Sequence, residues 1–187
     1  FPQPRILEII KDKGLQKTFY KENNIPTSNF RLIKSGKELT ENDIPCVIKA
    51  RSGGYDGKGV SVIKNKEDLT NVFDEPCLVE DLVDFHKEIS VIVARNENGE
   101  VKSYPVVDME FSPTANLVEF LFSPAEIPGH IEEKAREIAV KIVSDFELTG
   151  ILAVEMFWTK NDDVIVNEVA PRPHNSGHQT IEGNVCS

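Results

Sequence analysis

Hydrophobic residues recur at intervals of three and four positions in two parts of the chain, which is the spacing of an amphipathic helix. The first part covers residues 5–23, where Gly14 interrupts the pattern and Pro26 ends it. The second part, 129–146, predicts the longest helix, packed on a sheet through its apolar stripe. The stripes consist of Ile6, Leu7, Ile9, Ile10, Leu15 and Phe19 in the first part, and of Ile131, Ala135, Ile138, Ala139, Ile142 and Val143 in the second.

Short runs rich in β-branched and aromatic residues predict strands along most of the remaining chain. Between two of these runs, Asn98 and Gly99 give the strongest two-residue hairpin signal, which predicts an antiparallel pair. Asn65, with Asp68 three residues later, predicts the start of a short helix over 65–73. The predicted strands are 45–50, 60–63, 77–80, 88–95, 101–108, 117–122, 151–158 and 164–169. We therefore predict an α+β fold with mainly antiparallel strands and few helices.

The composition narrows the classes of function. A net charge of −10 over 187 residues argues against nucleic-acid binding, which depends on many lysines and arginines. No apolar run reaches the ~20 residues that a membrane helix needs, so we expect no membrane partner. The three cysteines, Cys46, Cys77 and Cys186, are widely spaced and lack a metal-binding pattern, which favours a reduced, cytoplasmic setting.

A glycine-rich, cationic loop follows the predicted strand 45–50. Residues 49–59 read KARSGGYDGKG, so small residues can turn backbone N–H groups toward an anion while Lys49 and Lys58 supply charge. The loop joins strand to strand, which suits a flap that closes over a nucleotide. The alternative is a plain hairpin turn with Tyr55 and Asp56 on the surface.

The predicted hairpin over 151–169 carries acidic residues on both strands. A turn centred on Asn161 and Asp162 places Glu155 opposite, or one step from, Asn167 and Glu168, with Cβ atoms ~5 Å apart. Two carboxylates at that distance raise each other's pKa unless a cation lies between them, so we interpret them as a magnesium site. A slip of one residue in the register would turn one of them to the other face.

Two further segments carry candidate chemistry. The segment 80–83 (EDLV) and Glu88 can offer backbone groups to a flat heterocycle and a carboxylate to a sugar diol, or they can be solvated charge. Directly after the last predicted strand, residues 167–178 read NEVAPRPHNSGH, where an arginine and two histidines lie close to the acidic pair. That density of polar groups next to an apolar run indicates a site for a metal and an anion.

In this order, the segments 53–59 (GGYDGKG) and 167–178 resemble the ATP-grasp superfamily. The chain is most similar to the family of carboxyaminoimidazole ribonucleotide synthetases, the ATPase subunits of phosphoribosylaminoimidazole carboxylase. The resemblance implies an ATP-grasp core of two α+β subdomains around a nucleotide site. Residues 1–77 would form the small subdomain with a linking helix and the flap, and residues 78–187 the large one with the metal and bicarbonate site.

The resemblance also implies an ATP-dependent ligase that phosphorylates bicarbonate and transfers its carboxyl group to aminoimidazole ribonucleotide in purine biosynthesis. The cofactors would be ATP and Mg²⁺, and a homodimer of the full-length protein is left open. For the nucleotide, the resemblance implies phosphate binding by Lys49, Gly54, Tyr55, Asp56, Gly57, Lys58 and Gly59, adenine binding by Glu80, Asp81, Leu82 and Val83, and ribose binding by Glu88. Asn167 and Glu168 would bind nucleotide and metal, with Glu155 as a further metal ligand. For the substrates, it implies bicarbonate binding by Arg172, His174 and Asn175, and contact of Tyr55 and Asp56 with the ribonucleotide.

The chain departs from the family pattern at two places. It has Asp108–Phe111 where the family often carries Glu-Asn and then a nucleotide-binding histidine, and Lys13 where an arginine is common. The resemblance places an N-terminal domain and a C-terminal part of the family outside residues 1–187. We therefore expect these residues alone to be inactive in carboxylation and at most a slow bicarbonate-dependent ATPase. Two alternatives remain, namely another ATP-grasp ligase, which should lack the run 173–178 (PHNSGH), and a nucleotide-binding module without turnover.

Overall fold

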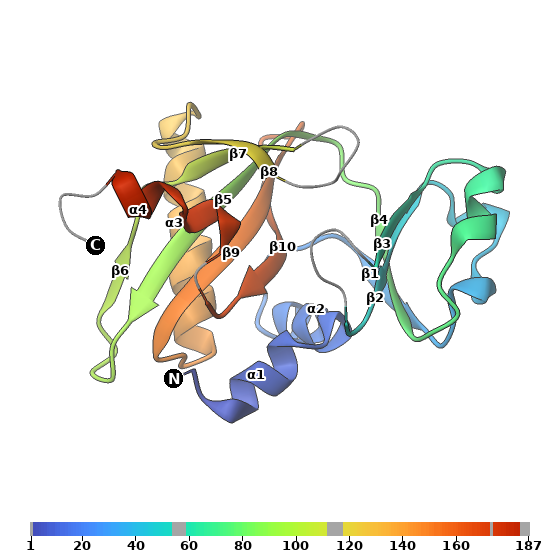
Figure 1. The fold of residues 1–187 in the computed structure, drawn as a ribbon, viewed down its shortest axis with the longest axis horizontal. Coiled ribbons are helices and arrows are strands. Elements are labelled where there is room, and N and C mark those ends of the chain that lie inside the picture. The colour runs from blue at the N-terminus through green and yellow to red at the C-terminus, as the bar shows by residue number, and fades with distance from the viewer. Residues whose placement is uncertain (1, 54–58, 112–117, 173, 184–187) are drawn as a thin grey trace.

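A computed structural model describes residues 2–53, 59–111, 118–172 and 174–183. Its strands form two separate antiparallel sheets, one small and one large (Figure 1). The elements are α1 (Pro4–Ile10), α2 (Lys13–Glu22), β1 (Phe30–Ile33), η1 (Gly36–Glu38), η2 (Glu41–Asp43), β2 (Cys46–Ala50), β3 (Val60–Ile63), η3 (Lys66–Asn71), β4 (Cys77–Asp81), β5 (Phe85–Arg95), β6 (Val101–Ser103), β7 (Val107–Phe111), β8 (Val118–Phe122), α3 (Gly129–Asp145), β9 (Gly150–Thr159), β10 (Val164–Ala170), η4 (Asn175–Gly177) and α4 (Gln179–Glu182). The predicted α+β class is confirmed.

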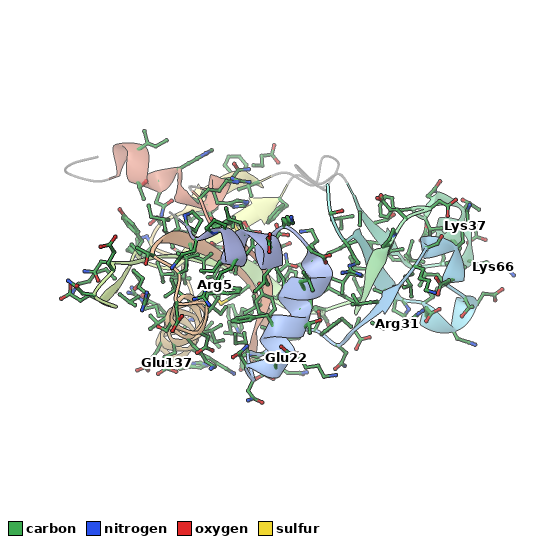
Figure 2. The ribbon with its side chains drawn as sticks, turned by 90° about the horizontal axis from the view of Figure 1, so that it is seen from below. Arg5, Glu22, Arg31, Lys37, Lys66 and Glu137 are labelled. Atoms are coloured by element: carbon green, nitrogen blue, oxygen red, sulfur yellow. The ribbon has the colours of Figure 1, made fainter. Side chains whose placement is uncertain are left out.

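The small sheet has the strand order β1-β4-β2-β3. One of its faces is covered by the short 3-10 helices, and a separate core forms there around Ile48, Ile63 and Cys77, all fully buried. Asn65 caps η3 in a capping box with Asp68, as predicted, but the element is a 3-10 helix that ends at Asn71. This unit lies to the right in Figure 1, and its charged side chains project outward in Figure 2.

The large sheet has the order β10-β9-β5-β7-β8, with β6 paired to the far half of β5. Helix α3 lies across one face (Figure 1), and all six residues of its predicted stripe are buried there. The hairpin at Asn98–Gly99 is confirmed, with Gly99 at φ +87°. The single strand predicted over 101–108 is instead two strands, β6 and β7, because Pro105 between them has no N–H to give to a ladder. The last predicted strand before α3 begins at Val118, and residue 117 lies outside the described part of the chain.

The helix predicted over 5–23 is wrong in one respect, because it is two helices that meet at Asp12. Asp12 has extended backbone angles, and its carboxylate accepts hydrogen bonds from the backbone N–H groups of Gly14 and Leu15. An aspartate in that position starts a new helix rather than continuing one. Gly14 therefore lies inside α2, where a Cβ atom would come within 2.8 Å of Arg51 Nε.

Helices α1 and α2 pack on the large unit, since Ile6, Ile10 and Tyr20 belong to its core. Strand β4 lies in the small sheet, so the chain changes sheets between Asp81 and Phe85. A domain boundary at residue 77 stays a prediction. Among the described residues, no helix is long and apolar enough to cross a membrane.

Candidate functional site

The hairpin of β9 and β10 brings the predicted acidic residues together. Glu168 pairs directly with Glu155, and the register shifts by one residue at Asn167, which forms a β-bulge. A bulge leaves its extra residue out of the ladder and re-aims its side chain. Glu155 is therefore opposite Glu168, one of the two positions that the sequence left open, while Asn167 turns toward the small sheet and contacts Lys49.

A third carboxylate, Glu88 on β5, lies close to this pair. Its neighbour Ser90 pairs with Glu155 across β5 and β9, and side chains two residues apart share a face of a strand. Burial and then the charges of Glu155 and Glu168 raise the pKa of Glu88 to about 7, although Lys49 opposes the rise. Three acidic groups therefore converge on one face of the large sheet, and one of them holds its proton near neutral pH.

Each of the predicted metal ligands has a cationic or basic partner. Lys13 of α2 forms an ion pair with Glu168, Lys49 of β2 donates to Asn167 Oδ1 at 2.7 Å, and His174 Nδ1 lies 2.8 Å from Glu155 Oε1.

These contacts shift the pKa values of two of the partners. Burial alone would raise the pKa of Glu168, but Lys13 and Lys49 outweigh it and lower that pKa. The contact with Glu155 raises the pKa of His174 against the effect of burial. The acidic face is thus neutralised by groups that come from three different elements.

A second charged cluster lies beside the first, almost without solvent. Glu80 accepts Lys17 Nζ at 2.5 Å and Lys49 Nζ at 2.7 Å, and it also accepts the Ser28 hydroxyl at 2.6 Å. Burial raises the pKa of Glu80, but Lys49 and Lys17 outweigh it and hold it at about 2.

The two ends of this cluster affect stability with opposite signs. A lowered carboxyl pKa stabilises the fold above pH 4.5, and this contribution is lost as the pH falls toward 2. Burial lowers the pKa of Lys17 from 10.5 to about 8, so it costs stability increasingly as the pH falls from 10.5 and in full below 8. The two contributions therefore oppose each other, and the cluster holds the Lys49 ammonium group at Glu80.

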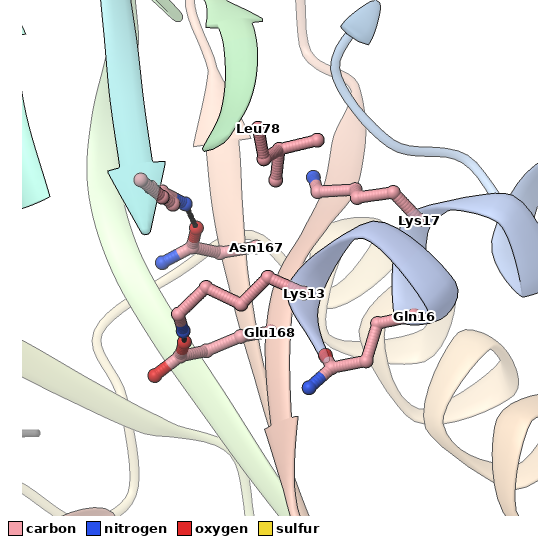
Figure 3. A pocket seen from close by; sticks show the side chains of 7 residues that line it. Lys13, Gln16, Lys17, Leu78, Asn167 and Glu168 are labelled. Atoms are coloured by element: carbon pink, nitrogen blue, oxygen red, sulfur yellow. Dashed lines mark hydrogen bonds and ion pairs between the residues drawn. The ribbon is translucent and has the colours of Figure 1, made fainter. Parts of the chain in front are cut away.

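The lysines of both clusters, with Asn167 and Glu168, line a small pocket between α2, β2, β4 and β10 (Figure 3). Lys13, Gln16 and Lys17 reach it from α2, and Asn167 and Glu168 from β10, while Leu78 supplies an apolar wall. The pocket therefore lies where the small and the large unit meet. Lys13 and Lys17 stand four residues apart on one helix face, which is the sequence signal that could have identified Lys17.

The base of the glycine loop is held by α2. Arg51 donates to both Asp12 carboxylate oxygens, at 3.0 and 2.7 Å, and the Lys13 N–H donates to the Arg51 carbonyl at 2.8 Å. At the other end of the loop, Gly59 accepts the Ala50 N–H at 2.8 Å and has φ +78°. The predicted phosphate and substrate residues Gly54, Tyr55, Asp56, Gly57 and Lys58 lie outside the described residues.

Two side chains of the segment 80–83 are bound to other residues of the chain. The buried Glu80 carboxylate is engaged by two lysines and a serine within the chain. Asp81 accepts Asn29 Nδ2 at 2.8 Å, and Leu82 is partly exposed. An adenine-binding role for Glu80, Asp81, Leu82 and Val83 stays a prediction and would fall to backbone groups of 81–83.

The residues after β10 approach the same acidic face. His174 is half-buried against Glu155, whereas Arg172 and Asn175 are exposed. Ser176 is fully buried and bonds to Ser90, a contact that the sequence analysis missed. Among the described residues, no three His, Cys, Asp or Glu side chains are arranged to hold a metal by themselves.

The junction between the small and the large unit presents three lysines together with the amide and the carboxylate of Asn167 and Glu168, which are groups that bind a phosphorylated ligand. The chain belongs to the ATP-grasp family, since the model of the ATP-grasp domain matches residues 18–187. The predicted family and fold are thereby confirmed.

Among its relatives, the N5-carboxyaminoimidazole ribonucleotide synthase of Bacillus subtilis is 36% identical over 185 residues, which are 95% of this chain and 48% of that protein. The crystal structure of the synthetase of Thermotoga maritima is 44% identical, with a TM-score of 0.84, over 97% of this chain and 47% of that one. The synthase of Aspergillus clavatus, in complex with ADP and 5-aminoimidazole ribonucleotide, is 29% identical with a TM-score of 0.85, over 97% and 49%. The chain thus spans at most about half the length of these relatives.

Proposed function

We propose that this chain supplies the ATP-grasp core of a ligase that carboxylates aminoimidazole ribonucleotide. In this reaction the bicarbonate oxygen attacks the γ-phosphorus of ATP, and ADP leaves. The exocyclic amine then attacks the carbonyl carbon of carboxyphosphate, loses a proton and expels phosphate. Relatives that are named as N5-carboxyaminoimidazole ribonucleotide synthases support the proposal, as does one that is described in complex with ADP and the ribonucleotide.

The observation that carries the proposal is the pairing of Lys13 and Lys49 with Glu168 and Asn167. Lys49 reaches the junction from β2 of the small sheet and Lys13 from the start of α2, and both are directed at oxygen atoms on β10. Phosphate oxygens of a bound nucleotide would compete for the same ammonium groups. Charge of this kind stabilises a phosphoryl group during transfer because it is already in place when the reaction begins.

Magnesium fits the same residues. It is usually held by one or two carboxylates together with substrate phosphates rather than by a cage of protein ligands. Glu155 and Glu168 face each other across two strands, with the Asn167 amide beside them, so the donors are hard oxygens. Glu155, Glu168 and Asn167 would hold the ion, whose charge would stabilise the phosphates of the nucleotide.

The other roles follow from position. Lys49 would contact phosphate, Glu88 the ribose, and the backbone of 81–83 the adenine. His174, held at Glu155, would bind bicarbonate or carboxyphosphate, with Arg172 and Asn175 beside it. At the family's histidine position the chain has Phe111, the last residue of β7, so this position would not supply the nucleotide contact of a histidine. The cytoplasmic setting remains part of the proposal, and the buried free thiols Cys46 and Cys77 agree with it.

The test measures ADP release by purified residues 1–187 in Mg²⁺ and ATP, with bicarbonate or with acetate as the added anion. We expect calorimetry to detect Mg²⁺-dependent ATP binding and ADP release to require bicarbonate. Release with acetate instead would favour another carboxylate–amine ligase. Tight binding with no anion-dependent release, by residues 1–187 and by the full-length protein alike, would favour a nucleotide-binding module and overturn the proposal. Adding aminoimidazole ribonucleotide to the full-length protein then tests the second half-reaction.

A further inference from the structure

A buried pair of hydroxyl groups joins the segment after β10 to the centre of the large sheet. Ser90 of β5 donates to the Ser176 hydroxyl, with 3.0 Å between the two Oγ atoms, and both residues have no exposed surface. They are 86 positions apart in the chain. Neither residue belongs to the set that binds nucleotide or metal in the proposed function.

The pair continues a row of polar residues across three strands. Ser90 on β5 pairs with Glu155 on β9, and Glu155 pairs with Glu168 on β10. Above this row, Ser176 contacts Ser90 and His174 contacts Glu155. Ser176 and His174, two positions apart in the segment, thus contact Ser90 and Glu155, which are neighbours in the row. A displacement of Ser176 would move His174 away from Glu155.

A close packing contact fixes the same segment at a second point. A Cβ atom on Gly177 would come within 2.7 Å of Ile92 Cδ1, so the segment lies flat on β5 at this residue. Ile92 is two positions from Ser90, and η4 as a whole contacts β5. Packing thus sets the distance of the segment from the sheet. The hydroxyl pair, which has a preferred direction, sets its position along the strand.

We propose that Ser90 and Ser176 are positioning residues that hold His174 at Glu155 in the anion site. The inference rests on the proposed function, in which His174 binds bicarbonate or carboxyphosphate. Its physical basis is that a buried hydroxyl must be hydrogen-bonded, so the segment has one favourable docking position. Groups that orient a binding residue typically change activity when they are removed, even though they do not touch the substrate.

The test uses Ser176→Ala and Ser90→Ala, alone and combined, with Thr159→Ala as the matched control. Thr159 is a buried hydroxyl of β9 that accepts the Asp163 N–H at 3.1 Å, away from His174. The double variant removes both partners and leaves no unpaired hydroxyl, so we expect it to fold even if a single variant does not. Uniform ¹⁵N labelling of the histidines reports the ring of His174, with His86 and His130 as internal references.

We expect the ring signals of His174 to shift or broaden in the double variant and to stay unchanged in Thr159→Ala. Bicarbonate-dependent ADP release should fall about tenfold, with the KM for ATP within roughly twofold of wild type. Ring signals of His174 that coincide with those of wild type in the double variant would overturn the inference. Wild-type protein without bicarbonate-dependent release would refute the proposed function instead, while the ring signals would still decide whether the pair positions His174.

Discussion

Replacing Glu88 by glutamine should stabilise the nucleotide-free protein, and the effect should depend on pH. Glu88 is largely buried, lies near Glu155 and Glu168, and is only partly compensated by Lys49. Glutamine has nearly the same shape but carries no charge and no proton to lose. The substitution therefore removes the unfavourable charge and leaves the packing in place.

The sign and the size follow from the pKa of Glu88, which rises from 4.5 to about 7 on folding. Between these values the folded state holds a proton that the unfolded state has lost, so stability falls as the pH rises. At about 1.4 kcal/mol per pKa unit the cost reaches about 3 kcal/mol above pH 7 and disappears below pH 4.5. Glu88→Gln should thus add about 3 kcal/mol at pH 8 and almost nothing at pH 4.5.

Urea unfolding followed by circular dichroism, at several pH values between 4.5 and 8.5 and without nucleotide or Mg²⁺, measures this difference. With a slope of about 2–3 kcal/mol per M, the midpoint of the variant should rise by about 1 M urea at pH 8. Glu97→Gln, in the exposed turn before β6, is the control and should show no such trend. A gain for Glu88→Gln of the same size at pH 4.5 and pH 8 would refute the reasoning, because the charge of Glu88 would not be its source.

Three more predictions concern the neighbouring groups. Lys17→Met leaves Glu80 buried with one ammonium partner and should cost about 3–5 kcal/mol in urea unfolding, and adding Glu80→Gln should recover most of this loss. Glu155→Gln and Glu168→Gln should each weaken Mg²⁺-dependent ATP binding about tenfold or more in calorimetry, while the melting temperature should change much less. Equal affinity of the wild type for ATP with and without Mg²⁺ would contradict the metal site. Gly36→Ala places a Cβ atom 2.6 Å from a backbone carbonyl oxygen of the small unit and should cost about 1–3 kcal/mol, so unchanged stability would mean that this loop moves aside freely.

Much of the fold could be predicted because its signals are local. The stripe of α3, the capping box of η3 and the Asn98–Gly99 turn each depend on residues within a few positions of one another. The closeness of Glu155 to Asn167 and Glu168 could also be predicted, since a tight turn fixes the register of its hairpin, but the bulge that makes Glu168 the direct partner could not. The break at Asp12 was missed because its carboxylate can either cap a helix or lie exposed within one.

The tertiary structure decided how the candidate site is assembled. The sequence by itself determined which residues carry charge and which segments are strands, and its two signature segments determined the family. Only the fold could show that Lys17 and Glu80 neutralise each other, that Asn167 is turned toward Lys49 by a bulge, and that Ser176 lies on Ser90. These contacts join residues that are 63, 118 and 86 positions apart. Such distant pairs form only when two sheets and a helix pack together, so no local pattern of the chain records them.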